Sequence, residues 1–249
     1  VAARVTPPAG GPAPAARTEP VARRLDPETY GRLLPLARSA RLTRPQVVLA
    51  ALDAALADLG GHFPRATTMV VAGRPRAHVQ GAVGWFASQV AVVDPARHAA
   101  SATAPARHAG PATARARRAD PRERLSAFRA VVTAALDAAR IPWPLAVADA
   151  VPALFSRPLS LPYLSFNAQP LRMRTALAPL PFAGTEVSEV PINLGRQEGA
   201  LLSYWVEEDD GGLRASLRYK PGVYDEADVA ALWTATAGHL AAFLRSAGR

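Results

Sequence analysis

The chain has 249 residues, a formal net charge of +9 at pH 7 and no cysteine, which excludes disulfides, thiolate catalysis, zinc–thiolate sites and iron–sulfur clusters. Hydrophobic residues make up 49% of the chain, enough for a substantial core, so the protein is not wholly disordered. No stretch approaches the roughly 18 uncharged apolar residues of a membrane span, and we expect no membrane partner.

Two segments differ in composition from the rest of the chain. Residues 1–24 are rich in proline, alanine, glycine and arginine without hydrophobic periodicity, which indicates a linker or arm. Residues 95–119 have a similar composition and predict a mobile insertion, because long aperiodic stretches are uncommon inside compact domains. We therefore expect one folded lobe over residues 25–247, interrupted by this insertion.

The first part of the expected lobe is helical. Asp26 is a good N-cap for a helix that has Pro27 in its first turn, and Pro35 should kink or shorten that helix. Thr43 and Gln46 have the spacing of a capping box, followed by a helix that is apolar on most faces. The glycine pair at residues 60–61 should end this second helix.

The remaining elements mix strands and helices. Strands are expected at residues 67–72 and, after a glycine turn, within residues 81–93; a helix follows Asp120, and a shorter one spans residues 145–155. Four strands come next, at residues 161–169, 186–195, 201–208 and 213–220, the last two joined by a four-residue hairpin loop at 209–212. Asp225 then caps an amphipathic helix. This order, ending in an antiparallel meander, predicts an α/β (α+β) two-layer sandwich in which helices cover a mixed, largely antiparallel sheet.

Several kinds of chemical site are weak or excluded. The five histidines do not cluster at metal-ligand spacing, so we expect no metal site. There is no nucleophile elbow, and a phosphate loop is impossible around Lys220, the only lysine. The arginines of residues 73–76 could bind an anion, although a solvated strand-end turn is the simpler interpretation. The acidic run at residues 207–210 could hold a hard cation, although hairpin tips are usually solvated.

The aromatic and basic residues leave further alternatives. Eight aromatic residues could form a stacking surface, but they lie mostly in apolar strands and fit a core better: Trp85, Phe86, Trp143, Phe155, Tyr163, Phe166, Tyr204 and Trp205. The net charge alone would suggest nucleic-acid binding. However, residues 1–24 carry +3 and residues 95–119 carry +5, which leaves the lobe near neutral. We therefore expect no specific nucleic-acid partner and regard the two segments as basic appendages, whose modest role would be contact with an acidic carrier protein.

Several short segments follow one another in a distinctive order. The first three are a threonine-capped apolar helix (residues 41–59), a strand ending in Gly-Arg (70–74) and a glycine–aromatic motif (83–88). The last three are an Ile-Pro-Trp after a long helix (141–143), a Ser-Arg-Pro-Leu followed by a strand (156–167) and a closing strand and turn (213–225). In this order they resemble the C-terminal half of a condensation domain of nonribosomal peptide synthetases, in the chloramphenicol-acetyltransferase-like acyltransferase superfamily.

The resemblance implies a function for the whole domain and a part of it for this chain. Condensation domains join a carrier-bound acyl thioester to a carrier-bound amine, with phosphopantetheine delivered on peptidyl carrier proteins rather than bound as a cofactor. This lobe would form one wall of their tunnel and pair with an N-terminal lobe in the cytoplasm. By resemblance, the near-tunnel positions are Gly73, Arg74, Gly84, Phe86 and Ser88; ordinary strand-end structure is the alternative for all five.

The chain also departs from the family pattern. Ser88 replaces the usual asparagine, Ala139-Arg140 replace a polar pair, and one residue is missing between Arg157 and Pro158. The catalytic signature, His-His-three residues-Asp-Gly, belongs to the N-terminal lobe, and no His-His pair occurs here. We therefore assign no catalytic residue and expect no activity from the chain alone. The alternative is a non-catalytic module that docks carrier proteins or another synthetase domain.

Overall fold

The first two helices begin and end where their capping residues predict. In the computed structural model, which describes residues 21–60, 63–64, 66–72, 87–93, 120–140, 149, 161–169, 200–209 and 212–247, helix α1 spans Pro27–Ala40 and α2 spans Arg44–Leu59. Asp26 Oδ1 accepts a hydrogen bond from the Thr29 N–H at 2.8 Å. Hydrogen bonding to the Thr29 side chain and to this N–H lowers the pKa of Asp26. Helix α1 continues through Pro35 for another turn, so this proline does not end it.

The capping box of α2 is complete. Thr43 Oγ1 accepts from the Gln46 N–H at 3.3 Å, and Gln46 Oε1 accepts from the Thr43 N–H at 2.8 Å. The helix ends at Gly60, whose φ of 57° suits a residue without a Cβ. More than half of α2 is buried, which matches its nearly uniform apolar sequence.

The two later helices also start at predicted aspartates. Helix α6 spans Pro121–Asp137 behind Asp120 and continues as a short 3-10 turn, η1, over Ala138–Arg140. Helix α9 spans Glu226–Ala247; the Asp225 carboxylate accepts from the Asp228 N–H at 2.9 Å, and the Asp228 carboxylate accepts from the Asp225 N–H at 3.1 Å. The expected helix at residues 145–155 and the expected strand at residues 186–195 lie outside the described residues, apart from Asp149.

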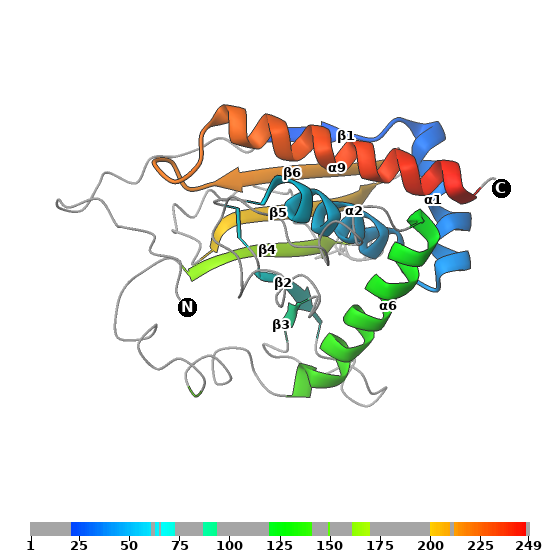
Figure 1. Ribbon diagram of the computed structural model, residues 1–249, viewed down its shortest axis with the longest axis horizontal. Coiled ribbons are helices and arrows are strands. Elements are labelled where there is room, and N and C mark those ends of the chain that lie inside the picture. Colours follow the sequence, from blue (N-terminus) through cyan, green and yellow to red (C-terminus); the bar gives the residue numbers. More distant parts are fainter. Residues whose placement is uncertain are drawn as a thin grey trace, which may run out of the picture.

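Six strands form one mixed sheet in the order β1-β6-β5-β4-β2-β3 (Figure 1). Their bounds are Val21–Arg24 (β1), Ala66–Val71 (β2), Ser88–Val92 (β3), Leu161–Gln169 (β4), Ala200–Asp209 (β5) and Gly212–Tyr219 (β6). The pairs β1–β6, β5–β6 and β2–β3 are antiparallel, whereas β4 is parallel to both of its neighbours, β2 and β5.

Three sequence expectations need correction. Residues 21–24 are a strand of the sheet and not part of an arm, because they pair with residues 214–217 of β6; the lobe therefore includes Arg23 and Arg24. The β5–β6 hairpin leaves only residues 210 and 211 between its strands, since Asp209 pairs with Gly212. The final strands are not a simple antiparallel meander, because β4 and β5 run parallel. The nature of residues 1–20 stays a prediction.

The four helices with described bounds, α1, α2, α6 and α9, lie on one face of the sheet, which gives the predicted two layers. Helices α2 and α9 cross this face side by side, α1 lies at one end, and α6 packs beside β3 (Figure 1). Alternate residues of each strand point to this layer: Tyr204 stacks on Phe166 with ring centroids 6.0 Å apart and meets Trp233 of α9 at 5.1 Å. These residues belong to one continuous apolar core, whose burial stabilises the fold.

Helix α9 passes a test of length and hydropathy for a membrane span. It has 22 residues, and a third of its most apolar window is buried inside the protein. Its apolar positions, including Leu232, Leu240 and Phe243, pack into the core against the sheet and α2. A core helix of this kind satisfies the same test, so the hydropathy of α9 carries no conclusion about a membrane.

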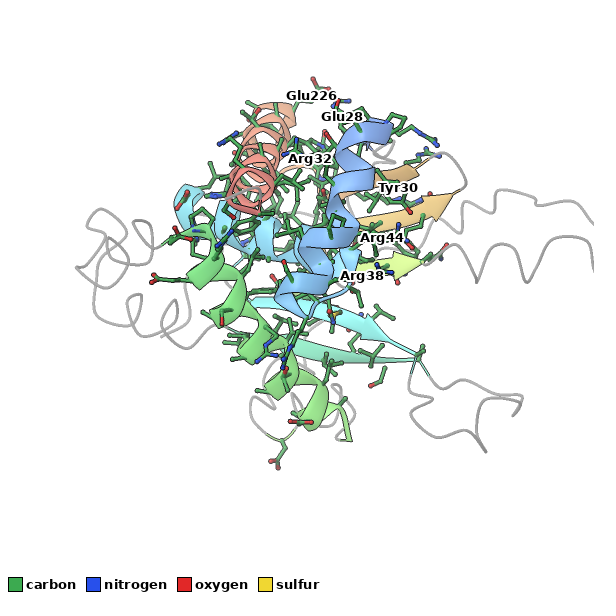
Figure 2. All side chains as sticks on the ribbon, turned by 90° about the vertical axis from the view of Figure 1, so that its right-hand side faces the viewer. Glu28, Tyr30, Arg32, Arg38, Arg44 and Glu226 are labelled. Carbon is green, nitrogen blue, oxygen red and sulfur yellow. The ribbon has the colours of Figure 1, made fainter. Side chains whose placement is uncertain are left out.

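An ion pair between the buried Glu208 and the partly exposed Arg44 ties the β5–β6 hairpin to α2. Arg44 Nε lies 2.9 Å from Glu208 Oε1, in an ion pair without hydrogen-bond geometry, and the Glu208 side chain is only 8% exposed. The same guanidinium lies over the ring of Tyr30, 4.6 Å from its centroid (Figure 2). A Cβ on Gly212 would meet the Leu25 carbonyl oxygen at 3.5 Å, so the start of β6 also packs closely here.

We predict that Arg44→Met destabilises the protein by about 3 kcal/mol, because it leaves the Glu208 carboxylate buried without its counter-charge. The free energy of unfolding can be measured by urea denaturation. The control is Arg38→Met, at an exposed position of α1, which should change stability by less than about 0.5 kcal/mol. The double variant Arg44→Met/Glu208→Leu should recover most of the loss. Equal effects of Arg44→Met and the control would contradict the prediction.

Candidate functional site

In the sequence, the suggested site residues follow β2 or come just before and at the start of β3. Gly73, Arg74, Gly84 and Phe86 lie outside the described residues, so their grouping stays a prediction. Ser88 is the first residue of β3 and pairs with Val71 near the end of β2. By register, Ser88 shares the helix-covered face with Val90 and Val92, which are core residues.

The sheet face turned away from the helices is polar along its centre. Thr68 of β2 pairs with Ser165 of β4, Ser165 pairs with Ser203 of β5, and Ser203 pairs with Arg218 of β6. Laterally paired residues point to the same side of a sheet, so this row presents three hydroxyls and a guanidinium on one face. We call the face that carries this row the far face.

The next row along the sheet continues the pattern. Asn167 pairs with Trp205, and Trp205 pairs with Ser216. The neighbouring residues of the same strands, Phe166, Tyr204 and Leu217, point to the other face and form the core under the helices. The contrast between the two faces shows that the far face differs in kind from the packed core.

Two hydroxyls of the far face are buried without a partner. Thr68 is fully buried and Ser203 is 3% exposed, yet neither hydroxyl makes a hydrogen bond within the described part of the chain. A buried polar atom without a partner is costly and unusual in folded proteins. Thr67, on the helix-covered face, also has a buried unpaired hydroxyl. The continuous row of polar side chains is therefore the feature that makes the far face the candidate functional surface.

The two glutamates of the acidic run lie on opposite faces of β5, whereas Asp210 lies outside the described residues. Glu207 lies on the far face beside Arg214, whereas Glu208 lies on the helix side, paired with Arg44. Alternation along a strand separates consecutive side chains onto opposite faces. Among the described residues, no three histidine, aspartate or glutamate side chains come close enough to hold a metal ion.

The aromatic residues divide between the two faces. Phe166 and Tyr204 belong to the core, as the sequence suggested, and burial raises the pKa of Tyr204 well above its usual range. Tyr163 and Trp205 lie on the far face by register. Trp85, Phe86, Trp143 and Phe155 lie outside the described residues. A broad stacking surface is therefore not assembled by the described aromatic residues.

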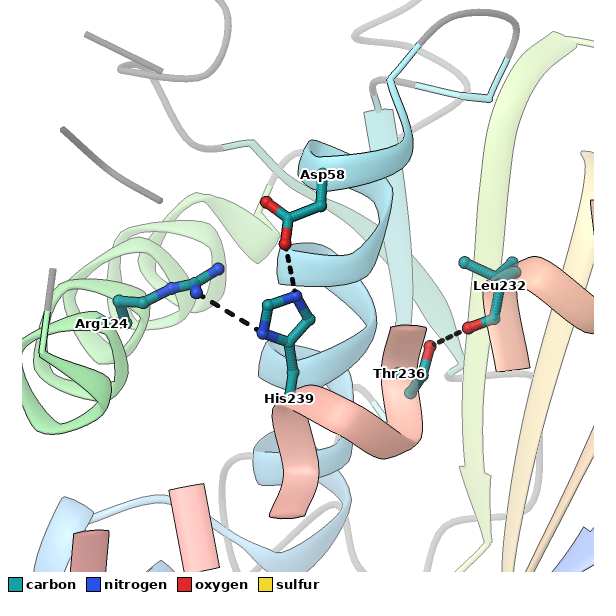
Figure 3. Close-up of polar contacts among 5 residues, drawn as sticks. All are labelled: Asp58, Arg124, Leu232, Thr236 and His239. Carbon is teal, nitrogen blue, oxygen red and sulfur yellow. Dashed lines mark hydrogen bonds and ion pairs between the residues drawn. The ribbon is translucent and has the colours of Figure 1, made fainter. Parts of the chain in front are cut away.

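A second polar cluster lies inside the helix layer (Figure 3). The His239 Nε2 atom of α9 is 2.8 Å from Asp58 Oδ2 of α2, and its Nδ1 atom is 3.5 Å from Arg124 Nη1 of α6. Desolvation lowers the pKa of His239, and the Arg124 charge lowers it further, while Asp58 opposes both effects. Sequence reasoning treated His239 as an isolated histidine, because its partners are 181 and 115 residues away.

This cluster is poorly arranged for acid–base catalysis. Arginine has only donors, so the Nδ1 lone pair of His239 faces an N–H group and not a substrate. Both ring nitrogens are thus engaged by neighbouring helices. The cluster joins α2, α6 and α9, and the described chain offers no nucleophile–base pair that would make it a catalytic centre.

No protein-family model matches the chain, and no curated protein sequence matches it, but many solved structures have its fold. The condensation domain from the monacolin K polyketide synthase MokA matches with a TM-score of 0.64, 18% identity, and coverage of 95% of this chain and 48% of its own. The X-domain from teicoplanin biosynthesis matches with a TM-score of 0.57, 20% identity and coverage of 93% and 47%. The first condensation domain of the calcium-dependent antibiotic synthetase matches with a TM-score of 0.56 and 16% identity, and the match covers 90% of this chain and 45% of that domain.

These matches show that the chain has the chloramphenicol-acetyltransferase-like fold of one condensation-domain lobe. The chain spans about half the length of the solved structures that it matches, while nearly all of the chain is used in each match. The sheet order and the helix layer described above therefore belong to a half, and the expected fold class is confirmed.

We predict that Thr68→Val and Ser203→Ala leave stability unchanged or raise it by up to about 1 kcal/mol, because removing an unpaired buried hydroxyl removes a desolvation cost. The control is Thr236→Val, which deletes a hydroxyl that donates to the Leu232 carbonyl at 2.7 Å (Figure 3). That control should lose about 1 kcal/mol. Thermal or urea unfolding measures all three, and a large loss at Thr68 or Ser203 would show that their hydroxyls do have structural partners.

Proposed function

We propose that this chain is the C-terminal lobe of a condensation domain and forms one wall of the tunnel in which a carrier-bound acyl thioester meets a carrier-bound amine. The observation that carries the proposal is the asymmetry of the structural matches. Condensation domains cover 90–95% of this chain with only 45–48% of their own length. A chain that reproduces half of such a domain should work with the other half.

The far face is the surface that we assign to the tunnel wall. The helix side is filled by the core, whereas the far face carries the row Thr68, Ser165 and Ser203 and the half-buried Trp205. An amine attacking a thioester depends mainly on alignment and on stabilisation of the developing oxyanion. A rigid sheet with polar side chains suits the alignment part of this task. Gly73, Arg74, Gly84 and Phe86 remain proposed near-tunnel positions. Ser88 has the register of the helix-covered face, so we propose that it borders the tunnel only from the start of β3.

The catalytic base must come from the other lobe. The chain contains no His-His pair, and the one described histidine, His239, is held between helices. We therefore propose that the N-terminal lobe supplies the His-His-three residues-Asp-Gly motif and that this lobe alone is inactive. Phosphopantetheine would arrive on peptidyl carrier proteins, in the cytoplasm, and would not be a resident cofactor of this lobe.

A second candidate function is a non-catalytic docking module. The X-domain from teicoplanin biosynthesis has the same fold and has been solved in complex with OxyB, with a TM-score of 0.57 to this chain. That protein shows that the fold can serve in a protein complex. In this alternative the chain binds carrier proteins or a partner synthetase domain without forming bonds.

We predict that the chain, co-expressed with an N-terminal condensation lobe that supplies the upstream His-His-three residues-Asp-Gly motif, purifies as a stable complex that forms an amide from a loaded acyl carrier and a loaded aminoacyl carrier. Product formation can be followed by mass spectrometry of the carrier-bound species. Replacing the second histidine of the upstream motif by alanine should abolish the product, and either half alone should be inactive. A chain that binds loaded carriers but never supports bond formation favours the docking alternative.

We also predict that Trp205→Ala weakens the complex between the two lobes by about 30-fold, because a tryptophan in an interface commonly contributes about 2 kcal/mol. The matched control is Leu34→Ala, which removes an exposed apolar side chain of α1. Surface plasmon resonance on the separated halves measures both affinities. Equal effects of the two substitutions, or no affinity between folded halves, would contradict the assignment of the far face.

A further inference from the structure

We propose that the contacts of His239 form an acid-sensitive joint between helices α2, α6 and α9. Protonation of the ring breaks its contact to α6 and keeps its contact to α2. Helix α6 then packs less firmly against the edge strand β3. This inference is independent of the proposed acyltransferase role. It concerns three helices that belong to the described fold whatever the lobe binds.

The two partners of the ring determine which nitrogen carries the proton. Nε2 lies 2.8 Å from a carboxylate oxygen of Asp58, which only accepts, and Nδ1 lies 3.5 Å from Arg124 Nη1, which only donates. The neutral ring therefore has its hydrogen on Nε2, donating to Asp58, and its lone pair on Nδ1, facing Arg124. In this tautomer His239 links α2, α9 and α6 at once (Figure 3).

Protonation changes the two contacts in opposite directions. The added hydrogen goes to Nδ1, where it faces the Arg124 guanidinium, so an attractive contact becomes a repulsion between two cations. On the other side, the charged ring forms a full ion pair with Asp58. Arg124 and Asp58 are the charged groups that face the ring among the described residues. The response is therefore directed at α6 and not at the whole helix layer.

The direction of the pKa shift agrees with this geometry. Desolvation and the Arg124 charge hold the pKa of His239 below its ordinary value, against the opposing effect of Asp58. A histidine with a lowered pKa in the folded state stabilises the fold above its ordinary pKa, and this contribution is lost as the pH falls through that value and below. The joint is closed at neutral pH and weakens on acidification.

Helix α6 is the element that such a change can release. Four apolar side chains hold it to the core: Leu125, Phe128, Val132 and Ala135. At its start, Arg122 Nε donates to the Ser246 carbonyl of α9 at 2.9 Å. By contrast, α2 and α9 share the most extensive helix–helix contact among the described elements. The contact between α6 and the other helices is thus smaller than that between α2 and α9. The Arg124–His239 contact therefore makes up a larger share of what holds α6 in place.

The edge strand β3 depends on this helix. In the sheet order β3 is terminal, with only β2 beside it, and α6 and η1 both contact it. An uncovered edge strand presents unpaired backbone N–H and C=O groups, which proteins commonly cover with a helix. Loosening α6 therefore exposes β3, whose first residue is Ser88, one of the proposed tunnel positions.

Hydrogen–deuterium exchange at pH 7.5 and pH 5.5, corrected for intrinsic exchange rates, tests the joint. In the native sequence we expect exchange in α6 and β3 to rise several-fold at the lower pH relative to α2, β4 and β5. His239→Gln should remove this difference, because the amide can donate to Asp58 and accept from Arg124 without changing charge. Arg124→Gln should also remove it, because the repelling cation is gone.

A nitrogen-15 NMR spectrum of the histidine rings gives a second, structural readout. At pH 7.5 the His239 ring should show the neutral form with hydrogen on Nε2, and Arg124→Gln should raise its pKa. Two results would overturn the proposal: unchanged exchange in α6 and β3 of the native protein at pH 5.5, or the same pH dependence in both glutamine variants. A ring that carries its hydrogen on Nδ1 at pH 7.5 would also overturn it. If one variant does not fold, the other decides the same question.

Discussion

The constraint on which this structure depends is the alternation of side chains in a sheet that carries its described helices on one face. Each central strand must present apolar residues to the helices at every second position, as Phe166, Tyr204 and Leu217 do. The intervening positions point away from the helices and need not be apolar, and they carry Ser165, Ser203 and Ser216. One register thus produces both the core and the far face, and a shift by one residue would exchange them.

Polar contacts then join the helices to the sheet and to one another. Arg44 connects the start of α2 to Glu208 near the end of β5, and His239 connects α9 to α2 and α6. Arg32 of α1 and Arg122 of α6 donate to carbonyls in the last turn of α9, at 3.4 and 2.9 Å. Cations at the C-terminal end of a helix also complement its dipole. These contacts join the ends or neighbouring faces of elements that are distant in the sequence.

Much of the local structure followed from short-range rules. The caps at Asp26, Thr43 and Asp225 predicted where helices begin, because each capping side chain and the N–H that it binds are only three residues apart. The strand β1 was missed because four residues in a proline- and arginine-rich context carry almost no periodicity; only its pairing with β6 makes it a strand. The hairpin loop was predicted two residues too long, since Asp209 and Gly212 resemble loop residues but pair across the ladder.

The sequence by itself determined the type of every described element except β1, the helix starts, the two-layer class, the absence of cysteine chemistry and the lack of an adjacent histidine pair. Only the tertiary structure decided which strands are neighbours and that β4 lies parallel to β2 and β5. It also showed that Glu208 pairs with Arg44 on the helix side, whereas Glu207 lies on the far face. It also brought Asp58, Arg124 and His239 together from three helices. The physical reason is range: capping and periodicity act over a few residues, whereas strand order and helix packing bring together residues far apart in the chain.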